Sequence, residues 1–469
     1  LLAQLALLRR RRRRRSATTA PVLDGPRELT SRWLEQMLPF PLTGDQRTAL
    51  GEIDDDLGQA RAMQRLLMGE VGSGKTVVAL YAMLRAVEQG LQAALMAPTE
   101  TLAEQHFATM QALLPGELVR AGLLTGSTPA RRRGELLARL GSGELSLIVG
   151  THALIEEAVE FAHLGVAVID EQHRFGVRQR AALDAKGRGQ ESPHVLHMTA
   201  TPIPRTLALA GYGDLDFTVL RELPRGRQPI QTFVCSTERE RARAYDRLRE
   251  ELREGRQAFV VCPLVEESEA LQARAATVEY ERLRGGELRD FRVLLLHGQL
   301  RSVDKQAAMA AFAARQADVL VATSVIEVGI DVPGATVMLV EDADRYGISQ
   351  LHQLRGRIGR GPHASLCLLF GPRDAARLRA VAQQSDGFSL AEVDLGLRGE
   401  GELVGTRQHG VAQYRVAELP RDAELLERAR IHAERIAGED PELAESQHAL
   451  LADALRDAYG AEAAAPIRA

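Results

Sequence analysis

The segment Gly69–Thr76, which reads G-E-V-G-S-G-K-T, limits the possible folds of this chain more than any other. It lies between an apolar run, Leu66–Met68, and a helix-like run that continues to Gln89. A strand, a glycine-rich loop and a helix in this order bind the phosphates of a nucleotide, because glycines let backbone N–H groups turn toward phosphate oxygens. Lys75 is expected to contact the β- and γ-phosphates, and the Thr76 hydroxyl to hold Mg²⁺. The predicted nucleotide-binding residues of this loop are Gly69, Gly72, Ser73, Gly74, Lys75 and Thr76.

Continuous apolar runs alternate with helical patterns along most of the chain, and they form two series. The first comprises Leu66–Met68, Ala93–Ala97, Leu147–Gly150, Val166–Ile169 and Val195–Met198. The second comprises Ala258–Cys262, Val293–Leu296, Val319–Ala322, Val337–Val340 and Leu366–Phe370. Such runs are typical of parallel strands that are buried on both faces, so the predicted fold class is α/β with two parallel-sheet lobes. Only the first series carries a phosphate loop, which indicates that the lobes share one nucleotide at their cleft.

Length and composition agree with a multidomain globular protein. The chain has 469 residues, of which 45% are hydrophobic and 26% charged. We predict a linker helix with a basic run at 1–30, lobes at 31–225 and 226–385, and a C-terminal element at 386–469. The run Arg9–Arg15 fits either a solvated helix end or a contact to a phosphate backbone. The net charge of −4 gives no general basic field, although a local basic groove is compatible with an acidic total.

The three cysteines are far apart, and no apolar stretch is long enough to span a bilayer. The cysteines show no metal-binding spacing, which favours a reducing compartment and argues against a structural metal.

An acidic pair follows the buried run Val166–Ile169. Asp170 is expected to hold Mg²⁺, and Glu171 to orient or deprotonate the water that attacks the terminal phosphate. A strand that ends in two acids is common by itself. Its place about 100 residues after a phosphate loop, between two strand–helix units, identifies it as the second half of the nucleotide site.

The segment Gln353–Arg360 interleaves three arginines with two glycines. We expect Arg357 and Arg360 to reach across the cleft and to neutralise charge that develops on the transferred phosphoryl group. An arginine in this role raises the rate by roughly 10³–10⁵. Because these arginines belong to the other lobe, hydrolysis would require closure of the cleft, which couples chemistry to motion.

Two further segments follow strands in equivalent places of the two lobes. The first, Thr199–Thr206, contains two prolines and is predicted to couple the lobes through Thr199 and Thr201. In the second, Ala322–Pro333, Thr323 is expected to contact a nucleic-acid phosphate, and Gly329 and Asp331 are expected to face the nucleotide.

The order of these motifs resembles that of superfamily 2 helicases. The matching elements are Gln46, GEVGSGKT, APTETLAEQH, LLTGS, GTHALI, DEQH, TATPIPRT, VCPLVEES, LLHGQL, ATSVIEVGIDVP and QLRGRIGR. Within this superfamily the chain is most similar to the RecG family of bacterial ATP-dependent DNA helicases, over about residues 30 to 440. The stretches that favour this family are Ile169–Arg180, Gly211–Ile230 and Asp386–Gly410.

The resemblance implies further site residues. Gln46 would read N6 and N7 of adenine, which favours ATP over GTP. The first-lobe contacts to DNA would be Thr99, Glu100, Thr125, Gly126 and Thr151. The second-lobe contacts would be His297, Gly298 and Thr323. The motif that couples hydrolysis to movement on duplex DNA would contain Arg398, Glu400, Gly401, Glu402, Arg407 and Gln408. His409 departs from the small polar residue usual in the family.

The resemblance also implies two tandem RecA-like helicase lobes with a small helical and hairpin translocation element. The implied function is an ATP-dependent DNA helicase and duplex translocase that uses ATP and Mg²⁺. Its substrates would be branched and double-stranded DNA, in the reversal of stalled forks and the migration of Holliday junctions. A monomer at the bacterial nucleoid in the cytoplasm is implied, with single-strand-binding protein as a further partner. The family also carries an N-terminal OB-fold wedge. This sequence starts with Leu at what resembles the linker helix, so we expect a fragment without the wedge.

Three alternative classes of protein predict different residues at these motifs. A translocase of the transcription-repair coupling type shares both lobes, but it usually has D-E-E-H where this chain has D-E-Q-H at Asp170–His173. A GTPase switch predicts an N-K-x-D tetrapeptide, and the sequence has none. A non-catalytic binding module predicts the loss of Lys75, Glu171 or Arg360, and all three are present.

Overall fold

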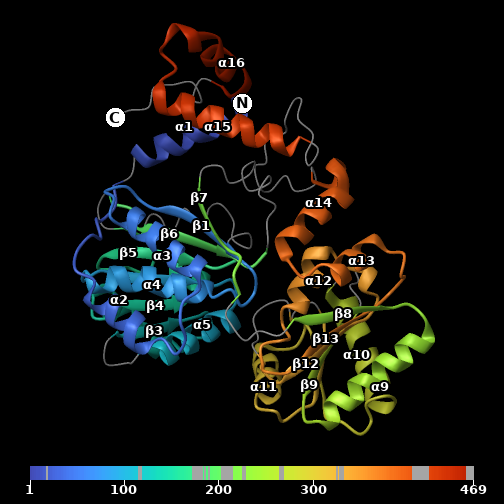
Figure 1. Ribbon diagram of the computed structural model, residues 1–469. Coiled ribbons are helices and arrows are strands. Elements are labelled where there is room, and N and C mark those ends of the chain that lie inside the picture. Colours follow the sequence, from blue (N-terminus) through green and yellow to red (C-terminus); the bar gives the residue numbers. More distant parts are fainter. Residues whose placement is uncertain are drawn as a thin grey trace.

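The computed structural model describes two α/β lobes, each built on one parallel sheet, and a helical C-terminal region (Figure 1). The described residues are 1–16, 19–114, 119–171, 183, 186–187, 191–201, 215–223, 229–262, 269–323, 326, 332–403 and 422–460. Within these ranges only the backbone is described for residues 10–16, 269–270, 302, 398–403 and 423. No helix of the described chain combines the length and the apolar character needed to cross a membrane.

The first lobe contains a seven-stranded sheet in the order β3-β4-β2-β5-β6-β1-β7. Its strands are β1 (Gln64–Gly69), β2 (Gln92–Met96), β3 (Ala121–Leu124), β4 (Leu147–Gly150), β5 (Leu164–Ile169), β6 (His194–Thr199) and β7 (Asp216–Leu220). Every pairing is parallel, so all carboxyl ends of the strands lie along one edge. In open parallel sheets this edge is where ligands bind.

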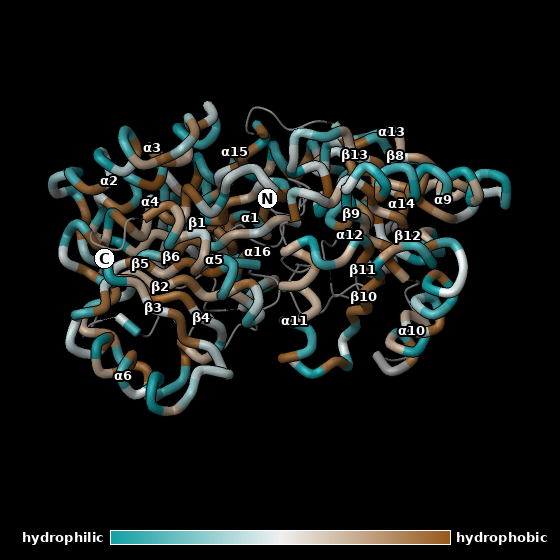
Figure 2. Tube along the Cα trace, turned by 90° about the horizontal axis from the view of Figure 1, so that it is seen from below, coloured by the Kyte–Doolittle hydropathy of each residue, from teal (hydrophilic) through white to brown (hydrophobic). Residues whose placement is uncertain are grey.

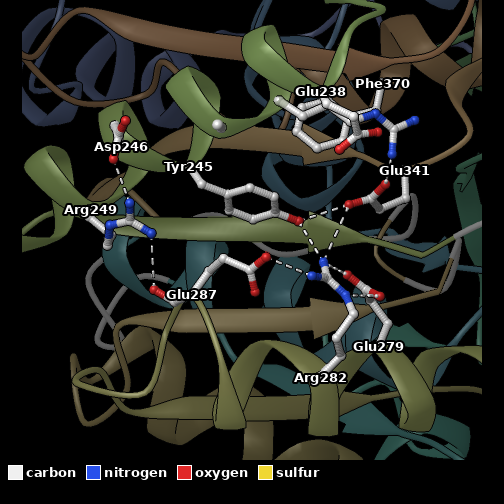
Figure 3. Close-up of a pocket in the computed structure, with 11 residues that line it drawn as sticks. Glu238, Tyr245, Asp246, Arg249, Glu279, Arg282, Glu287, Glu341 and Phe370 are labelled. Carbon is white, nitrogen blue, oxygen red and sulfur yellow. Dashed lines mark hydrogen bonds and ion pairs between the residues drawn. The ribbon is translucent and has the colours of Figure 1, made fainter.

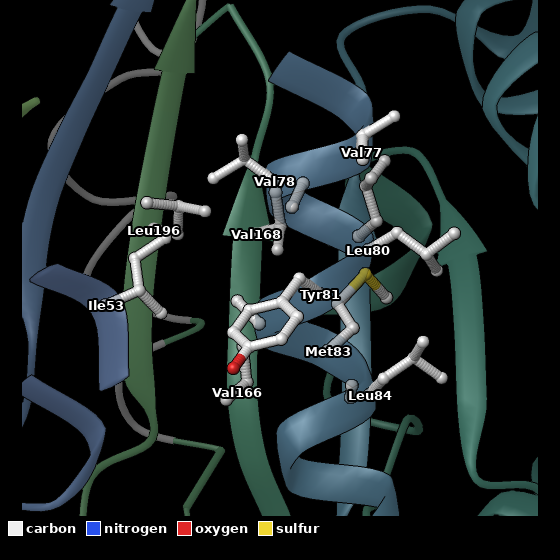
Figure 4. Packing of buried hydrophobic residues seen from close by; sticks show 14 of the residues in the cluster. Ile53, Val77, Val78, Leu80, Tyr81, Met83, Leu84, Val166, Val168 and Leu196 are labelled. Atoms are coloured by element: carbon white, nitrogen blue, oxygen red, sulfur yellow. The ribbon is translucent and has the colours of Figure 1, made fainter. Parts of the chain in front are cut away.

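Helix α4 (Lys75–Glu88) follows the phosphate loop and is apolar on nearly its whole circumference. Its side chains pack against the sheet, with Val78 and Tyr81 facing Val166 and Val168 of β5 (Figure 4). Because the helix is buried from its first residue, the packing fixes its N-terminus and therefore the loop that enters it. The other helices of this lobe are α2 (Glu28–Arg32), α3 (Gly44–Leu57), α5 (Glu100–Leu113) and α6 (Ala130–Gly141), with the π-helix η1 (Trp33–Met37) and the 3₁₀ helix η2 (His152–Ile155).

The second lobe contains a six-stranded parallel sheet in the order β10-β11-β9-β12-β13-β8. The strands are β8 (Ile230–Cys235), β9 (Gln257–Val261), β10 (Val293–Leu296), β11 (Val319–Ala322), β12 (Ala335–Val340) and β13 (Ser365–Phe370). The helices are α9 (Glu238–Arg253), α10 (Glu269–Gly285), α11 (Ser302–Ala313), α12 (Ile348–Arg355) and α13 (Ala376–Gln383), with the 3₁₀ helix η5 (Ala343–Arg345). Two apolar clusters, one on each face of this sheet, form its core.

The N-terminal helix and the last two helices form a separate group beside the first lobe, whereas α14 (Gly387–Leu403) lies on the second lobe (Figure 1). Helix α14 leads from the second lobe to α15 (Ala423–Glu439), η7 (Ser446–His448) and α16 (Ala449–Tyr459). The N-terminal helix α1 (Leu2–Ser16) packs against α15 and α16, and Leu5 lies in their shared apolar cluster. Arg9 is only 2% exposed and donates to the carbonyl oxygen of Pro441. Arg9, the first residue of the basic run, is therefore neither solvated nor accessible to a phosphate backbone.

All ten predicted strands are present, and the parallel α/β class is confirmed. The sequence prediction missed β3, β7 and β8. Each of these three lies at an edge of its sheet and is less buried than its neighbours. The continuous hydrophobic colour of the inner strands is visible in Figure 2. Most of the predicted linker at 223–229, and the predicted hairpin part of the translocation element, lie outside the described residues. The proposed domain boundaries stay predictions.

Candidate nucleotide site between the lobes

The phosphate loop has a backbone that requires glycine. Gly72 and Gly74 adopt φ values of +87° and +86°, which side chains with a Cβ rarely accept. A Cβ on Gly74 would lie 2.1 Å from the Nε2 atom of Gln46, and one on Gly69 would lie 2.5 Å from the Ser73 hydroxyl. A side chain at Gly74 or Gly69 would therefore collide with Gln46 or Ser73, so the conformation of the loop depends on its glycines.

Gln46 supports this loop from the first turn of α3. Its Oε1 atom accepts from the backbone N–H of Thr43 at 2.9 Å, and the Thr43 hydroxyl accepts from the Gln46 N–H, which completes a capping box. Its Nε2 atom donates to the carbonyl oxygen of Ser73 at 2.9 Å. The side chain that is expected to recognise adenine is thus hydrogen-bonded to the phosphate loop.

Lys75 is buried, and its Nζ atom donates to the carbonyl oxygens of Gly69 (2.7 Å) and Glu70 (2.9 Å). Burial lowers the pKa of Lys75 to about 8, although the charges of Glu171 and Asp170 raise it. The two carbonyl groups are the partners that the ammonium group would exchange for phosphate oxygens.

Asp170 lies at the carboxyl end of β5, close to Lys75. Its Oδ2 atom is 2.7 Å from Nε2 of His106 on α5, and its Oδ1 atom accepts from the backbone N–H of Glu171. Burial alone would raise the pKa of Asp170, but the hydrogen bond from His106 and the charges of His106 and Lys75 outweigh it. They hold the pKa below its ordinary value. The carboxylate is therefore kept ionised, as a ligand of a divalent cation must be.

Glu171 has a φ of +49°, an unusual conformation for a residue with a side chain. Such a backbone costs about 1–3 kcal/mol and is found most often at functional sites. The positive φ turns the backbone directly after Asp170, which agrees with the expected position of Glu171 beside the nucleotide.

The oxygen ligands expected for Mg²⁺ are present in the first lobe. Thr76, half-buried as the second residue of α4, offers a hydroxyl, and Asp170 offers an ionised carboxylate. Magnesium prefers such oxygen ligands together with phosphate oxygens and water. The residues at this position therefore fit the ion.

Arg357 and Arg360 of the second lobe lie near the phosphate loop. The charges of both lower the pKa of Lys75, which places them within electrostatic reach of its ammonium group. The segment that carries them touches the loop directly, since a Cβ on Gly356 would lie 3.3 Å from the Cβ of Val71. The structure thus brings the two halves of the predicted site together.

The third arginine of this segment has a structural place. Arg355 is 5% exposed and donates to the carbonyl oxygens of Val381, Gln384 and Ser385, and its Nη2 is 2.8 Å from Nδ1 of His352. These bonds hold the end of α12 against the end of α13.

Hydrogen bonds also join the lobes. Gln353 Nε2 donates to the Thr201 hydroxyl at 2.6 Å, and Gln306 Nε2 of α11 donates to Glu104 of α5 at 3.0 Å. Within the first lobe the Thr199 hydroxyl accepts from the N–H of Thr201 at 3.1 Å. The predicted coupling residues Thr199 and Thr201 therefore lie at a contact between the lobes.

The predicted DNA contacts of the first lobe gather at the carboxyl ends of β2, β3 and β4. The Thr99 hydroxyl caps α5 by accepting from the N–H of Leu102 at 3.3 Å. Glu100 Oε1 accepts from the N–H of Ser127 at 2.9 Å and approaches Gly126. The other residues of this group are Thr125, which contacts Ser127 and Thr128, and Thr151, which is 1% exposed.

In the second lobe His297, Gly298 and Thr323 lie at the corresponding ends of β10 and β11. Lys305 donates to the carbonyl oxygen of Gly298. Burial, followed by the charge of Lys305, lowers the pKa of His297. The two groups thus occupy equivalent edges of the two sheets.

Several predicted site residues lie outside the described part of the structure. Gly329, Asp331, Arg407 and Gln408 are not described, and only the backbone is described for Arg398, Glu400, Gly401 and Glu402 on α14. The roles of these residues stay predictions.

His106 was not predicted as a site residue. It closes the motif Ala97–His106, so the sequence contained the residue, but its pairing with Asp170 depends on the packing of α5 beside β5.

A cavity of about 400 Å³ lies between α9 and α10 of the second lobe (Figure 3). Arg282 pairs there with Glu279 at 2.6 Å and Glu287 at 2.8 Å, and the Tyr245 hydroxyl donates to Glu341 at 2.9 Å. Because each of these side chains is hydrogen-bonded or ion-paired within the network, we attribute the network to the packing of the two helices.

The fold and the placing of one phosphate loop at the contact of two parallel-sheet lobes define the helicase class of nucleotide-binding proteins. Residues 43–209 match the profile of the DEAD/DEAH box helicase family, and residues 243–362 match the helicase conserved C-terminal domain. Residues 384–462 match the profile described as ATP-dependent DNA helicase RecG, domain 3, C-terminal.

Individual proteins agree with these matches. The chain is 52% identical over 411 residues to an ATP-dependent DNA helicase RecG of Synechocystis sp., covering 87% of this chain and 49% of that one. It is 51% identical over 424 residues to the corresponding protein of Mycobacterium tuberculosis, covering 85% and 58%. A solved structure of RecG bound to a three-way DNA junction superposes with a TM-score of 0.73 at 39% identity, covering 91% of this chain and 56% of that chain. The chain belongs to the RecG family of helicases.

The chain spans about half to three fifths of the length of these relatives. The match to the RecG-specific C-terminal profile does not favour the transcription-repair coupling alternative.

Proposed function

We propose that this chain is the ATP-driven duplex translocase part of a helicase that remodels branched DNA. The observation that carries the proposal is the contact across the cleft between the phosphate loop and the segment that carries Arg357 and Arg360, whose charges act on Lys75. Hydrolysis that depends on groups from both lobes takes place only when they are closed, so each cycle of closing and opening can shift the grip on DNA. ATP is the proposed nucleotide, since the curated relatives are named ATP-dependent.

Each residue of the site has a proposed role. Lys75 binds the terminal phosphates, Glu171 orients and deprotonates the attacking water, and Arg357 and Arg360 neutralise charge on the transferred group. Mg²⁺, when bound by Thr76 and Asp170 together with the phosphates, supplies positive charge to the same group. His106 holds the carboxylate of Asp170 in place by its hydrogen bond.

The proposed DNA-binding surface is the pair of strand edges that carry the predicted contacts of both lobes. These contacts come mainly from hydroxyl groups and backbone, which suit phosphate oxygens better than base edges. We therefore propose low sequence specificity. The branched substrate is suggested by the RecG structure bound to a three-way junction. We further propose that the protein acts as a monomer at the nucleoid, with single-strand-binding protein as a partner.

The test is the rate of ATP hydrolysis with and without duplex or three-way-junction DNA, over a range of salt concentrations. We expect stimulation by DNA that weakens as salt rises, because phosphate contacts release counterions. Lys75→Ala should abolish hydrolysis, and Glu171→Gln should bind ATP without turning it over. A rate that DNA leaves unchanged at every salt concentration would refute the translocase proposal.

A further inference from the structure

The first turn of α14 lies against the first lobe, although α14 follows the second lobe in the sequence. The backbone N–H of Gly387 donates to Oε1 of Glu70 at 2.5 Å. Glu70 is the second residue of the phosphate loop, and its side chain is 14% exposed. The nucleotide-binding loop therefore contacts the start of this helix directly.

An apolar contact reinforces the hydrogen bond. Phe388 lies in one cluster with Leu66 and Met68 of β1 and with Leu215. The guanidinium group of Arg221 stands 5.5 Å from the centre of the Phe388 ring. Strand β1 leads straight into the phosphate loop, so the ring of Phe388 packs on the strand that carries this loop.

Two residues further on, α14 belongs to the other lobe. Leu390 is buried in the apolar cluster of the second lobe, together with Leu351 and Leu354 of α12. The helix also packs against α13. The first turn of α14 thus contacts both lobes, through Gly387 and Phe388 on the first lobe and through Leu390 on the second.

Nucleotide binding is expected to change a hydrogen bond within the phosphate loop. Lys75 donates to the carbonyl oxygen of Glu70, and its ammonium group would leave that oxygen to contact phosphate. The residue that loses this bond is the residue whose carboxylate holds Gly387.

We propose that Glu70 is a positioning residue that holds the first turn of α14 on the phosphate loop, so that nucleotide binding is transmitted to α14. The proposal rests on the proposed function only for its consequence, since α14 continues toward the residues predicted to couple hydrolysis to movement. The transmission itself requires nucleotide binding alone.

The sharpest test removes one backbone hydrogen-bond donor. Gly387→Pro deletes the N–H that Glu70 accepts, and proline is tolerated in the first turn of a helix, where this N–H has no partner within the helix. Gly387→Ala keeps the N–H and is the matched control. Thermal melting checks that both variants are folded.

The first readout is hydrogen–deuterium exchange of the amides of Phe388, Ser389 and Leu390, which every variant retains, with and without a non-hydrolysable ATP analogue. In the unsubstituted protein and Gly387→Ala we expect the analogue to change exchange about tenfold, as for the loss or gain of one hydrogen bond to a charged group. In Gly387→Pro these amides should exchange at one rate in both conditions. An equal response in both variants, or no response in the unsubstituted protein, would overturn the proposal.

The second readout is the number of base pairs travelled per ATP on duplex DNA, which we expect to fall about tenfold in Gly387→Pro and not in Gly387→Ala. If Gly387→Pro does not fold, Glu70→Ala compared with Glu70→Gln replaces it in the exchange measurement, because glutamine retains an acceptor oxygen. Glu104→Ala, which breaks the bond to Gln306 between the same lobes, should leave the exchange response intact. If DNA fails to stimulate hydrolysis in the unsubstituted protein, the proposed function fails while the exchange result still decides the role of Glu70.

Discussion

Replacement of Gln46 by alanine tests whether one side chain both supports the phosphate loop and reads the base. Gln46 is 2% exposed, and its amide makes one hydrogen bond at each end, to the N–H of Thr43 and to the carbonyl of Ser73. An amide has two donor hydrogens and two acceptor lone pairs. One donor and one lone pair are therefore left for N7 and N6 of adenine.

We expect two separate effects of Gln46→Ala, one on the free energy of unfolding and one on the preference for ATP over GTP. Loss of the partner of the buried Ser73 carbonyl costs about 1–3 kcal/mol, and loss of the more accessible bond to Thr43 costs about 0.5–1.5 kcal/mol. We therefore expect Gln46→Ala to lower the free energy of unfolding by about 2–4 kcal/mol. A bidentate contact to adenine is worth about 1–3 kcal/mol of discrimination, so the preference for ATP over GTP should fall by roughly 5- to 150-fold.

Urea unfolding measures the first magnitude, and kcat/KM for ATP and GTP measures the second. The matched control is Gln92→Ala, because Gln92 is 3% exposed and also bonds backbone groups, those of Leu140, Leu145 and His163. It should lose stability and keep the nucleotide preference. Unchanged stability of Gln46→Ala would refute the hydrogen-bond reasoning, and an unchanged ATP-to-GTP ratio would refute the reading of adenine.

Three further predictions concern other residues of the chain. Arg360→Ala should lower kcat for DNA-stimulated hydrolysis by about 10³ with an unchanged melting temperature, whereas Arg355→Ala should lower the melting temperature, because it leaves three carbonyl groups unpaired; full activity of Arg360→Ala would contradict its role. His106→Ala should raise the Mg²⁺ concentration needed for half-maximal activity by about 10- to 100-fold, with partial rescue by asparagine, and an unchanged Mg²⁺ titration would show that its bond to Asp170 is only structural. Backbone N–H groups at the start of α9 hold the pKa of Glu240 at about 2. The ionised carboxylate therefore contributes fully to the stability of the folded protein above the ordinary glutamate pKa of 4.5, and this contribution is lost as the pH falls toward 2. Unfolding measured between pH 5 and 2 should therefore depend less on pH in Glu240→Gln than in the unsubstituted protein, and identical pH profiles would contradict the assignment.

The inner strands were predictable because each is covered on both faces. Strands such as β5 and β9 are buried at every position, so their sequences are continuous apolar runs. The three missed strands lie at sheet edges, where fewer neighbours cover them. Polar residues interrupt β7 and β8, and β3 is only four residues long and contains a glycine. Such short or mixed runs do not differ enough from a loop to be recognised by pattern alone.

The residues of the site also divide into those that local sequence patterns predicted and those that depend on packing. The phosphate loop is a local structure, so its residues were predictable from spacing, and Asp170 and Glu171 were predictable from the strand before them. The bonds of His106 to Asp170 and of Gly387 to Glu70 join residues 64 and 317 positions apart. Arg357 and Arg360 were predicted from the sequence to reach across the cleft, whereas the place of Arg355, which fastens α12 to α13, follows only from the packing of these helices.

The amino-acid sequence by itself determined the parallel α/β class, the position of the nucleotide-binding loop and the resemblance to a helicase family. These properties depend on residues that are close together in the chain, where periodicity and glycine spacing act directly on the backbone. Only the tertiary structure decided which side chains meet across the cleft and which helix rests on the phosphate loop. Those contacts are set by the packing of two sheets and their connecting helices, which brings together segments that share no local pattern.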